Sequence, residues 1–119
     1  MTEIKKQYDL EERTSNFSKR VRVFVGRLPK TIGNIEDGKQ LIRSSGSVGA
    51  NYIEANEALS KKDFLMRAKI CRKEAKESRY WLELIDINEN KHLEEERQSL
   101  IKEATELMNI FGSIIRKSE

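Results

Sequence analysis

The sequence has few of the residues that form disulfides, metal clusters and tight turns. Among its 119 residues are one cysteine, one histidine, one proline and six glycines. A single cysteine excludes an internal disulfide and a zinc site built from cysteines, and a single histidine excludes most histidine metal clusters. The low number of glycines and prolines argues against an all-β domain, which needs many turns.

Long apolar runs are absent as well. No run approaches the roughly 20 residues that a helix needs to cross a bilayer, and residues 1–13 contain no apolar stretch typical of a secretory signal. The phosphate-binding pattern Gly-x-x-x-x-Gly-Lys-Ser/Thr does not occur either. We therefore expect a soluble, cytoplasmic protein with no membrane partner, no metal, no cofactor and no small-molecule substrate.

Charge is abundant but nearly balanced. Charged residues make up 36% of the chain, above the average of about 25%. The 23 basic residues stand against 20 acidic ones, so the net charge is only +3. Disordered chains usually have fewer apolar residues and a larger net charge, which excludes a wholly disordered chain. The length suits one domain spanning residues 1–119.

Apolar side chains recur every three or four residues in four segments, as they do along one face of a helix. These segments are residues 10–28, 36–59, 61–88 and 93–115, and their predicted core stripes include Leu59, Phe64 and Ile114. Ser60 to Asp63 fits a capping box at the start of the third segment. Pro29 ends the first, because the residue before a proline is pushed out of the helical conformation. Four helices of about 20 residues with short connections predict an all-α fold, an antiparallel up-down-up-down four-helix bundle. Chain ends often fray, and residues 1–9 are the candidates for fraying here.

Small residues interrupt the second segment and leave two alternatives open. Gly46 and Gly49 stand in its middle, where each glycine costs about 1 kcal/mol relative to alanine. Either a neighbouring helix packs so closely that only small side chains fit, or the helix bends or breaks. Leu41, Val48 and Tyr52 keep their helical phase through the glycines, which favours close packing.

A second stripe runs along the third segment beside its core stripe. It is apolar at both ends and acidic in the middle. A monomeric bundle does not need such a stripe, and large apolar side chains left in water favour self-association. We therefore predict a homo-oligomer. Its candidate interface residues are Ile42, Ile53, Ile70, Glu74, Trp81 and Leu84.

Basic residues cluster in two parts of the chain. No acidic residue lies between Glu12 and Glu36, and residues 61–79 hold eight basic residues against three acidic ones. A basic stripe along helices is typical of RNA or DNA binding, since phosphate contacts need no sequence motif. A solvated face, an acidic protein partner or a neighbouring subunit would also account for the pattern, and the stripe could face outward or line a central pore. The candidate phosphate contacts are Lys19, Arg20, Arg22, Arg27, Lys30, Lys62, Lys69, Arg72, Lys73 and Lys76.

No pattern predicts catalysis. Cys71 lies on the core stripe of the third segment, so we expect it to be buried, without a base to activate it. His92 lies next to a predicted turn, so we expect it to be solvated. We therefore expect a protein that is not an enzyme.

Several runs resemble one known family. Residues 42–55, Ile-Arg-Ser-Ser-Gly-Ser-Val-Gly-Ala-Asn-Tyr-Ile-Glu-Ala, resemble the second-helix signature of the 23S ribosomal RNA intervening-sequence proteins. That signature reads roughly Arg-Ser-Ala-x-Ser-x-x-Ala-Asn-Ile-x-Glu-Gly. Residues 62–64 and 74–82 are similar to parts of the family's third helix, residues 28–29 to the end of its first, and residues 93–96 to the start of its fourth. The resemblance covers residues 15–116.

This resemblance implies a bacterial four-helix bundle that assembles into a ring, most often a pentamer, and has no enzyme activity. Related proteins include the accessory variability protein of diversity-generating retroelements, which implies nucleic acid and a reverse transcriptase as partners. Two departures from the signature matter: Tyr52 replaces the usual isoleucine and Ala55 the usual glycine. Ala55 in place of glycine predicts that the second helix continues further.

Overall fold

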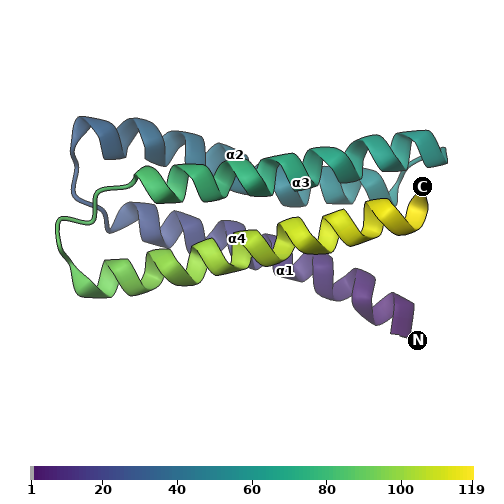
Figure 1. Ribbon diagram of the computed structural model, residues 1–119, viewed down its shortest axis with the longest axis horizontal. Helices are drawn as coiled ribbons and strands as arrows, with labels where there is room; N and C mark the ends of the chain where they lie inside the picture. Colours follow the sequence, from purple (N-terminus) through teal and green to yellow (C-terminus); the bar gives the residue numbers. More distant parts are fainter. Residues whose placement is uncertain (1) are drawn as a thin grey trace.

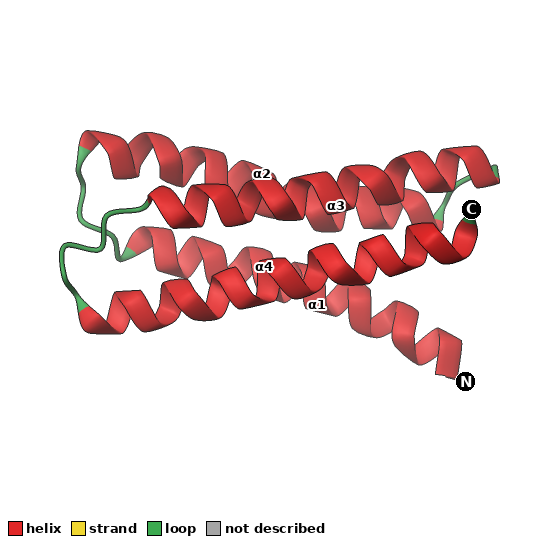
Figure 2. Cartoon of the chain, in the orientation of Figure 1, coloured by secondary structure: helices red, strands yellow, loops and turns green. Residues whose placement is uncertain are grey.

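Four helices make up most of the chain in the computed structural model, which describes residues 2–119 and the side chains of residues 10–119 (Figures 1 and 2). They are α1 (Thr2–Gly26), α2 (Ile32–Asn56), α3 (Lys61–Leu84) and α4 (Lys91–Ser118). Residues 2–119 contain no strand. The all-α class and the four helices that the sequence predicts are therefore confirmed.

The helices pack around one core in a closed order. The backbones of α1 and α2, α2 and α3, α3 and α4, and α4 and α1 lie close together, whereas within the described chain those of α1 and α3 do not approach each other. α1 and α3 therefore lie on one diagonal of the bundle. The loops 27–31 and 85–90 lie at one end of the molecule, and the loop 57–60 lies at the other end, near the C-terminus (Figure 1).

The apolar stripes meet in this core, and the predicted burial of Cys71 is confirmed. Three predicted core positions are wrong. Phe64, near the start of α3, is only half-buried. Leu59 is 98% exposed, because α2 ends before it and residues 57–60 form the loop. Ile115, not Ile114, is buried at the end of α4. A straight helix has 3.6 residues per turn, so its buried stripe drifts from a strict spacing of 3.5 over several turns.

Side chains cap the starts of the last three helices. The Oγ1 of Thr31 accepts a hydrogen bond from the Asn34 N–H at 3.1 Å, and the Oγ of Ser60 accepts one from the Asp63 N–H at 3.1 Å. Asn90 caps α4 in the same way, at 3.0 Å. Such caps satisfy N–H groups that have no partner inside the helix. The predicted cap at Ser60 is confirmed.

Several helix ends differ from the predicted ones. α1 starts at Thr2 rather than at residue 10, α2 spans Ile32–Asn56 rather than 36–59, and α4 spans Lys91–Ser118 rather than 93–115. The continuation of α2 predicted from Ala55 is wrong, because this helix ends one residue later. The fraying predicted for residues 1–9 stays a prediction, because residue 1 and the side chains of residues 2–9 lie outside the part of the chain that the structure describes.

α3 ends at Leu84 instead of residue 88 because a buried side chain binds the chain beyond it. Asn34 of α2 donates through Nδ2 to the carbonyl oxygens of Pro29 at 2.9 Å and Asp86 at 2.8 Å. Its Oδ1 accepts a hydrogen bond from the Asp86 N–H at 2.9 Å. One side chain thus joins the α1–α2 loop to the α3–α4 loop, and the backbone of Asp86 binds Asn34 instead of continuing the helix.

The glycines of α2 mark its close approach to α1. A Cβ atom at Gly38 would lie 3.0 Å from Val25 Cγ1, and one at Gly49 would lie 3.1 Å from Thr14 Oγ1. α2 is unbroken through these positions. Of the two alternatives that the sequence leaves open, close packing is confirmed.

Candidate nucleic-acid interface

The first set of candidate basic residues follows the outer side of α1 and the loop after it. We call this set the α1 group: Lys19, Arg20, Arg22, Arg27 and Lys30. Arg20 is half-buried and the other four are exposed. Arg20 donates to Ser99 Oγ at 2.7 Å, and Arg22 donates to the carbonyl oxygen and Oγ of Ser18. Among the described side chains, no carboxylate lies within 4.0 Å of any member of the group.

The second set lies on α3. We call it the α3 group: Lys62, Lys69, Arg72, Lys73 and Lys76, all exposed. One ion pair within the described chain involves this group, a loose contact of 3.9 Å between Lys69 Nζ and Glu119 Oε2. The other four members have no carboxylate within 4.0 Å there, so their charge is available to an external anion.

Arg116 of α4 extends the α3 group across the α3–α4 seam. A Cβ atom at Gly112 would lie 3.4 Å from Arg116 Nη1 and 4.0 Å from Arg72 Cδ, so both arginines border the same glycine. Neither forms an ion pair in the part of the chain that the structure describes. The sequence assigns Arg116 only to the negative end of the α4 dipole. Its membership in the basic surface depends on how α3 and α4 pack.

Other arginines hold the bundle together. Arg13 of α1 contacts Glu103 and Glu106 of α4, each at 2.7 Å. These carboxylates raise the pKa of the guanidinium, because their hydrogen bonds outweigh the opposing effect of burial. Arg67 donates to Asn51 Oδ1 at 3.0 Å, and Arg79 donates to Thr105 Oγ1 at 3.3 Å. The excess of basic residues counted along the chain therefore overstates the charge that is free on the surface.

The two basic groups do not form one continuous face. α1 and α3 lie on a diagonal of the bundle, and within the described residues their backbones do not approach each other. The single basic face expected from the sequence is therefore two separate surfaces. Of these, only the α3 group continues onto a neighbouring helix through an unpaired arginine among the described side chains.

The candidate interface residues are divided as well. Ile42 and Ile53 lie on the row of α2 that contains Gly38 and Gly49, and this row faces α1. Ile42 packs against the core, whereas Ile53 is exposed. The other four candidates, Ile70, Glu74, Trp81 and Leu84, share one flank of α3.

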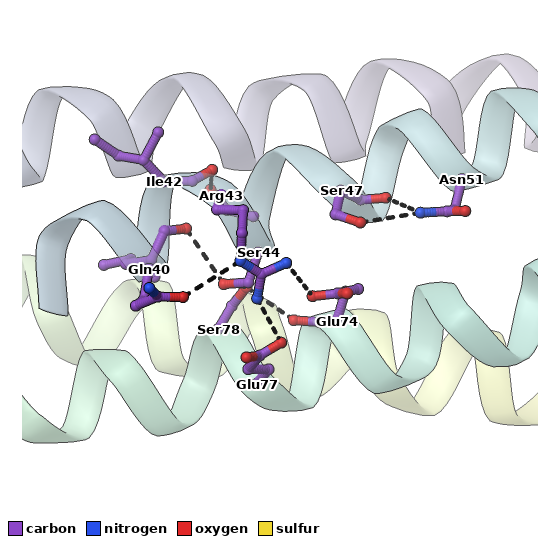
Figure 3. A network of polar contacts seen from close by, with 11 residues as sticks. Gln40, Ile42, Arg43, Ser44, Ser47, Asn51, Glu74, Glu77 and Ser78 are labelled. Atoms are coloured by element: carbon purple, nitrogen blue, oxygen red, sulfur yellow. Dashed lines mark hydrogen bonds and ion pairs between the residues drawn. The ribbon is translucent and has the colours of Figure 1, made fainter.

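A polar network joins that flank of α3 to α2. Arg43 reaches across from α2 and donates to Glu77 at 2.8 Å and to Glu74 at 3.5 Å (Figure 3). Below it, the hydroxyl groups of Ser44 and Ser78 lie 2.8 Å apart in the core. Glu74 is therefore already engaged within the chain.

The two carboxyl groups of this network differ in pKa. Burial raises the pKa of Glu74, and the hydrogen bond with Glu77 adds to the effect. Burial acts in the same direction on Glu77, but the hydrogen bond from Arg43, together with that from Glu74, outweighs it and lowers its pKa. Arg43 therefore stabilises the ionised form of Glu77 more than that of Glu74.

The nucleophilic and metal-ligating residues form no reactive cluster in the described chain. Burial raises the pKa of the Cys71 thiol to about 12, and the thiol lies 3.4 Å from the carbonyl oxygen of Val48. A thiol with this pKa is protonated at neutral pH and a poor nucleophile. Residues 10–119 contain no group of three or more His, Cys, Asp or Glu side chains that could hold a metal ion. None of the described helices is long and apolar enough to cross a membrane.

The fold and the exposed basic surfaces define a small all-α protein with two cationic faces. The chain belongs to the 23S rRNA-intervening sequence protein family, whose model matches residues 6–113. It is also similar to the crystal structure of a protein with unknown function from the S23 ribosomal protein family of Bacteroides thetaiotaomicron. The two chains are 31% identical with a TM-score of 0.78, over 93% of this chain and 98% of the other. No curated protein sequence matches the chain.

Proposed function

We propose that this protein is a non-catalytic, homo-oligomeric four-helix protein that binds nucleic acid through the α3 group. The observation that carries this proposal is the unpaired charge of that group. Four of its five members have no carboxylate within 4.0 Å in the described chain, although α3 itself contains Glu74 and Glu77. Arg43 occupies both of these carboxylates, so they do not neutralise the lysines.

Phosphates are the anions that best match this surface. The members of the α3 group follow one another at intervals of 7, 3, 1 and 3 residues along one helix, which rises about 1.5 Å per residue. A helix with such a row can follow a phosphate backbone without reading bases, as in electrostatic, sequence-independent binding. Arg72 and Arg116 border the same glycine, so a phosphate bound at this seam would be within reach of both side chains.

The narrower form of the proposal concerns assembly and partner. We propose an antiparallel up-down-up-down bundle, because the loops alternate between the two ends of the molecule (Figure 1). Half-exposed apolar side chains such as Leu84 support self-association. A ring of five, and ribosomal RNA or a reverse transcriptase as the biological partner, rest on the family resemblance alone.

The test is binding of a structured RNA and a DNA duplex to nuclease-treated protein across a salt series. Five phosphate contacts on a duplex predict that log K falls with log salt with a slope of about −4.5. Reversing Lys69, Lys73 and Lys76 to glutamate should remove about three contacts, lower the slope accordingly and abolish measurable binding at physiological salt.

A charge-matched control is available on the other diagonal helix. Reversing Lys19, Arg22 and Arg27 to glutamate changes the net charge equally but leaves the α3 group intact. We expect this variant to keep most of the affinity and the full salt slope. Equal losses in both variants would show a response to net charge rather than to a site. An α3 variant that binds nucleic acid as tightly as the wild type would contradict the proposal. A wild-type protein that binds no nucleic acid at low salt would also contradict it, and would point to an acidic protein partner.

A further inference from the structure

An exposed aromatic ring lies at the end of the basic row of α3. Tyr80 follows Lys76 by four residues and Lys73 by seven, so the three side chains lie along the same side of the helix. Tyr80 is 53% exposed, and it is the one exposed aromatic residue among the described side chains. A row of lysines that ends in an exposed ring offers both charge and a flat apolar surface.

The ring of Tyr80 is held by its neighbour. Its centroid lies 5.1 Å from that of Trp81, with the two planes at 66°, an edge-to-face contact. Trp81 packs against the hydrophobic core, so it restrains Tyr80 from one side. A restrained ring loses less conformational freedom when a ligand stacks on it than a mobile one does.

This combination favours unpaired bases over a duplex. In a double helix the faces of the bases are stacked on one another, so an aromatic side chain gains little beside it. Proteins that bind single strands combine a basic path for the backbone with aromatic rings on which bases stack. From Lys62 to Tyr80 the helix rises about 27 Å, which matches about eight nucleotides at the spacing of stacked bases.

We propose that the α3 group and Tyr80 form a binding site for a single-stranded nucleic acid, with one unpaired base stacked on the ring of Tyr80. This inference rests on the proposed function and narrows its ligand. The acidic residues near this row are compatible with such a site. Glu77 is paired with Arg43 at 2.8 Å, and Glu83 lies one turn beyond Tyr80, where its charge would repel further phosphates.

The experiment uses the single tryptophan of the chain as its reporter. Trp81 touches Tyr80, so a base that stacks there should change the tryptophan fluorescence. Oligo(U), oligo(dT) and a duplex of about 12 residues are titrated against the wild type and three variants. Tyr80→Ala removes the ring and Tyr80→Phe keeps it. Val23→Ala, on α1 among the residues of the α1 group, removes an apolar side chain that is equally exposed, at 54%.

We expect the single strands to bind more tightly than the duplex. Tyr80→Ala should weaken single-strand binding by about 5- to 150-fold, while Tyr80→Phe and Val23→Ala should match the wild type. The loss should be the same at every salt concentration, because stacking releases no counterions, whereas lysine reversal should change the salt slope. Comparing the affinities for oligo(U) and oligo(dT) shows whether the site distinguishes RNA from DNA.

Two results would overturn the inference without touching the proposed function. One is a duplex that binds as tightly as a single strand, and the other is a Tyr80→Ala variant with wild-type affinity. In both cases charge-driven binding by the α3 group would stand. Failure of every nucleic acid to bind at low salt would instead remove the proposed function, and the inference with it. Circular dichroism of Tyr80→Ala checks that the variant remains folded.

Discussion

Alanine substitutions at two glycines of α2 should affect the stability of the protein differently, and only one of them should stabilise it. The positions are Gly46 and Gly49, both inside the unbroken helix. Alanine gains about 1 kcal/mol of helix propensity over glycine at each. The surroundings differ, because a Cβ at Gly46 meets its nearest atoms at 3.7 Å and one at Gly49 meets Thr14 Oγ1 at 3.1 Å. The distance of 3.7 Å is an ordinary van der Waals contact, whereas 3.1 Å is tighter than such a contact, so a neighbouring atom must move.

Thr14 cannot easily move away from a new methyl group. It is 1% exposed, and its hydroxyl donates to the carbonyl oxygen of Glu11 at 3.0 Å. Its own Cβ would lie 3.4 Å from the new Cβ, so relief requires a rotation of this buried side chain or a small shift of α1. Overpacking of this kind costs about 1–3 kcal/mol. We expect Gly46→Ala to stabilise the protein by about 1 kcal/mol and Gly49→Ala to be neutral or destabilising by up to about 2 kcal/mol.

The assay is urea and thermal unfolding, followed by circular dichroism at one fixed protein concentration, since self-association would shift the midpoint. The propensity gain cancels between the two variants, so their unfolding free energies should differ by about 1–3 kcal/mol. The double variant Thr14→Ala/Gly49→Ala has room for the methyl group. Relative to Thr14→Ala alone, it should therefore recover the gain of about 1 kcal/mol.

Equal stabilisation by Gly46→Ala and Gly49→Ala would refute this reasoning. It would mean that α1 does not approach α2 closely at Thr14. A Gly49→Ala variant that is destabilised to the same extent with and without Thr14→Ala would show that the cost arises elsewhere.

Three further predictions concern the polar contacts between helices. Arg13→Gln should destabilise the protein by about 1 kcal/mol and speed amide exchange in the C-terminal half of α1, because α4 then holds α1 less firmly; unchanged exchange would contradict this. Asn34→Ala should cost about 2–4 kcal/mol in denaturant unfolding, because three backbone hydrogen bonds of two loops lose their partner; a cost below about 1 kcal/mol would show that water replaces the amide. Glu77→Gln should destabilise at pH 7 by about 0.2–1 kcal/mol, and this loss should vanish as the pH falls through the lowered pKa of Glu77. Glu74→Gln should behave in the opposite way, becoming favourable as the pH rises through the raised pKa of Glu74, where the wild type must ionise a buried group; parallel pH profiles for the two variants would be inconsistent with their opposite shifts.

The four helices and most of their buried faces follow from local patterns in the sequence. Spacings of three and four residues are a local property of each segment, so Phe17, Cys71 and Leu107 could be placed in the core before their neighbours were known. The cap at Ser60 was equally visible, because capping depends on residues three positions apart. The phase of the α2 stripe through its glycines was enough to favour an unbroken helix.

Which charges remain free, and which surfaces they form, depends on how the four helices pack. Arg13 counts as one more positive charge in the sequence, yet Glu103, 90 residues away, neutralises it. Asn34 ends α3 through contacts 52 residues distant, which no local pattern encodes. Periodicity fixes which side of a helix is buried, but the neighbour that each flank meets depends on the order and rotation of all four helices in the bundle. For that reason the two basic segments, alike in sequence, lie on opposite corners of the bundle, and only the one on α3 continues into Arg116 and ends at Tyr80.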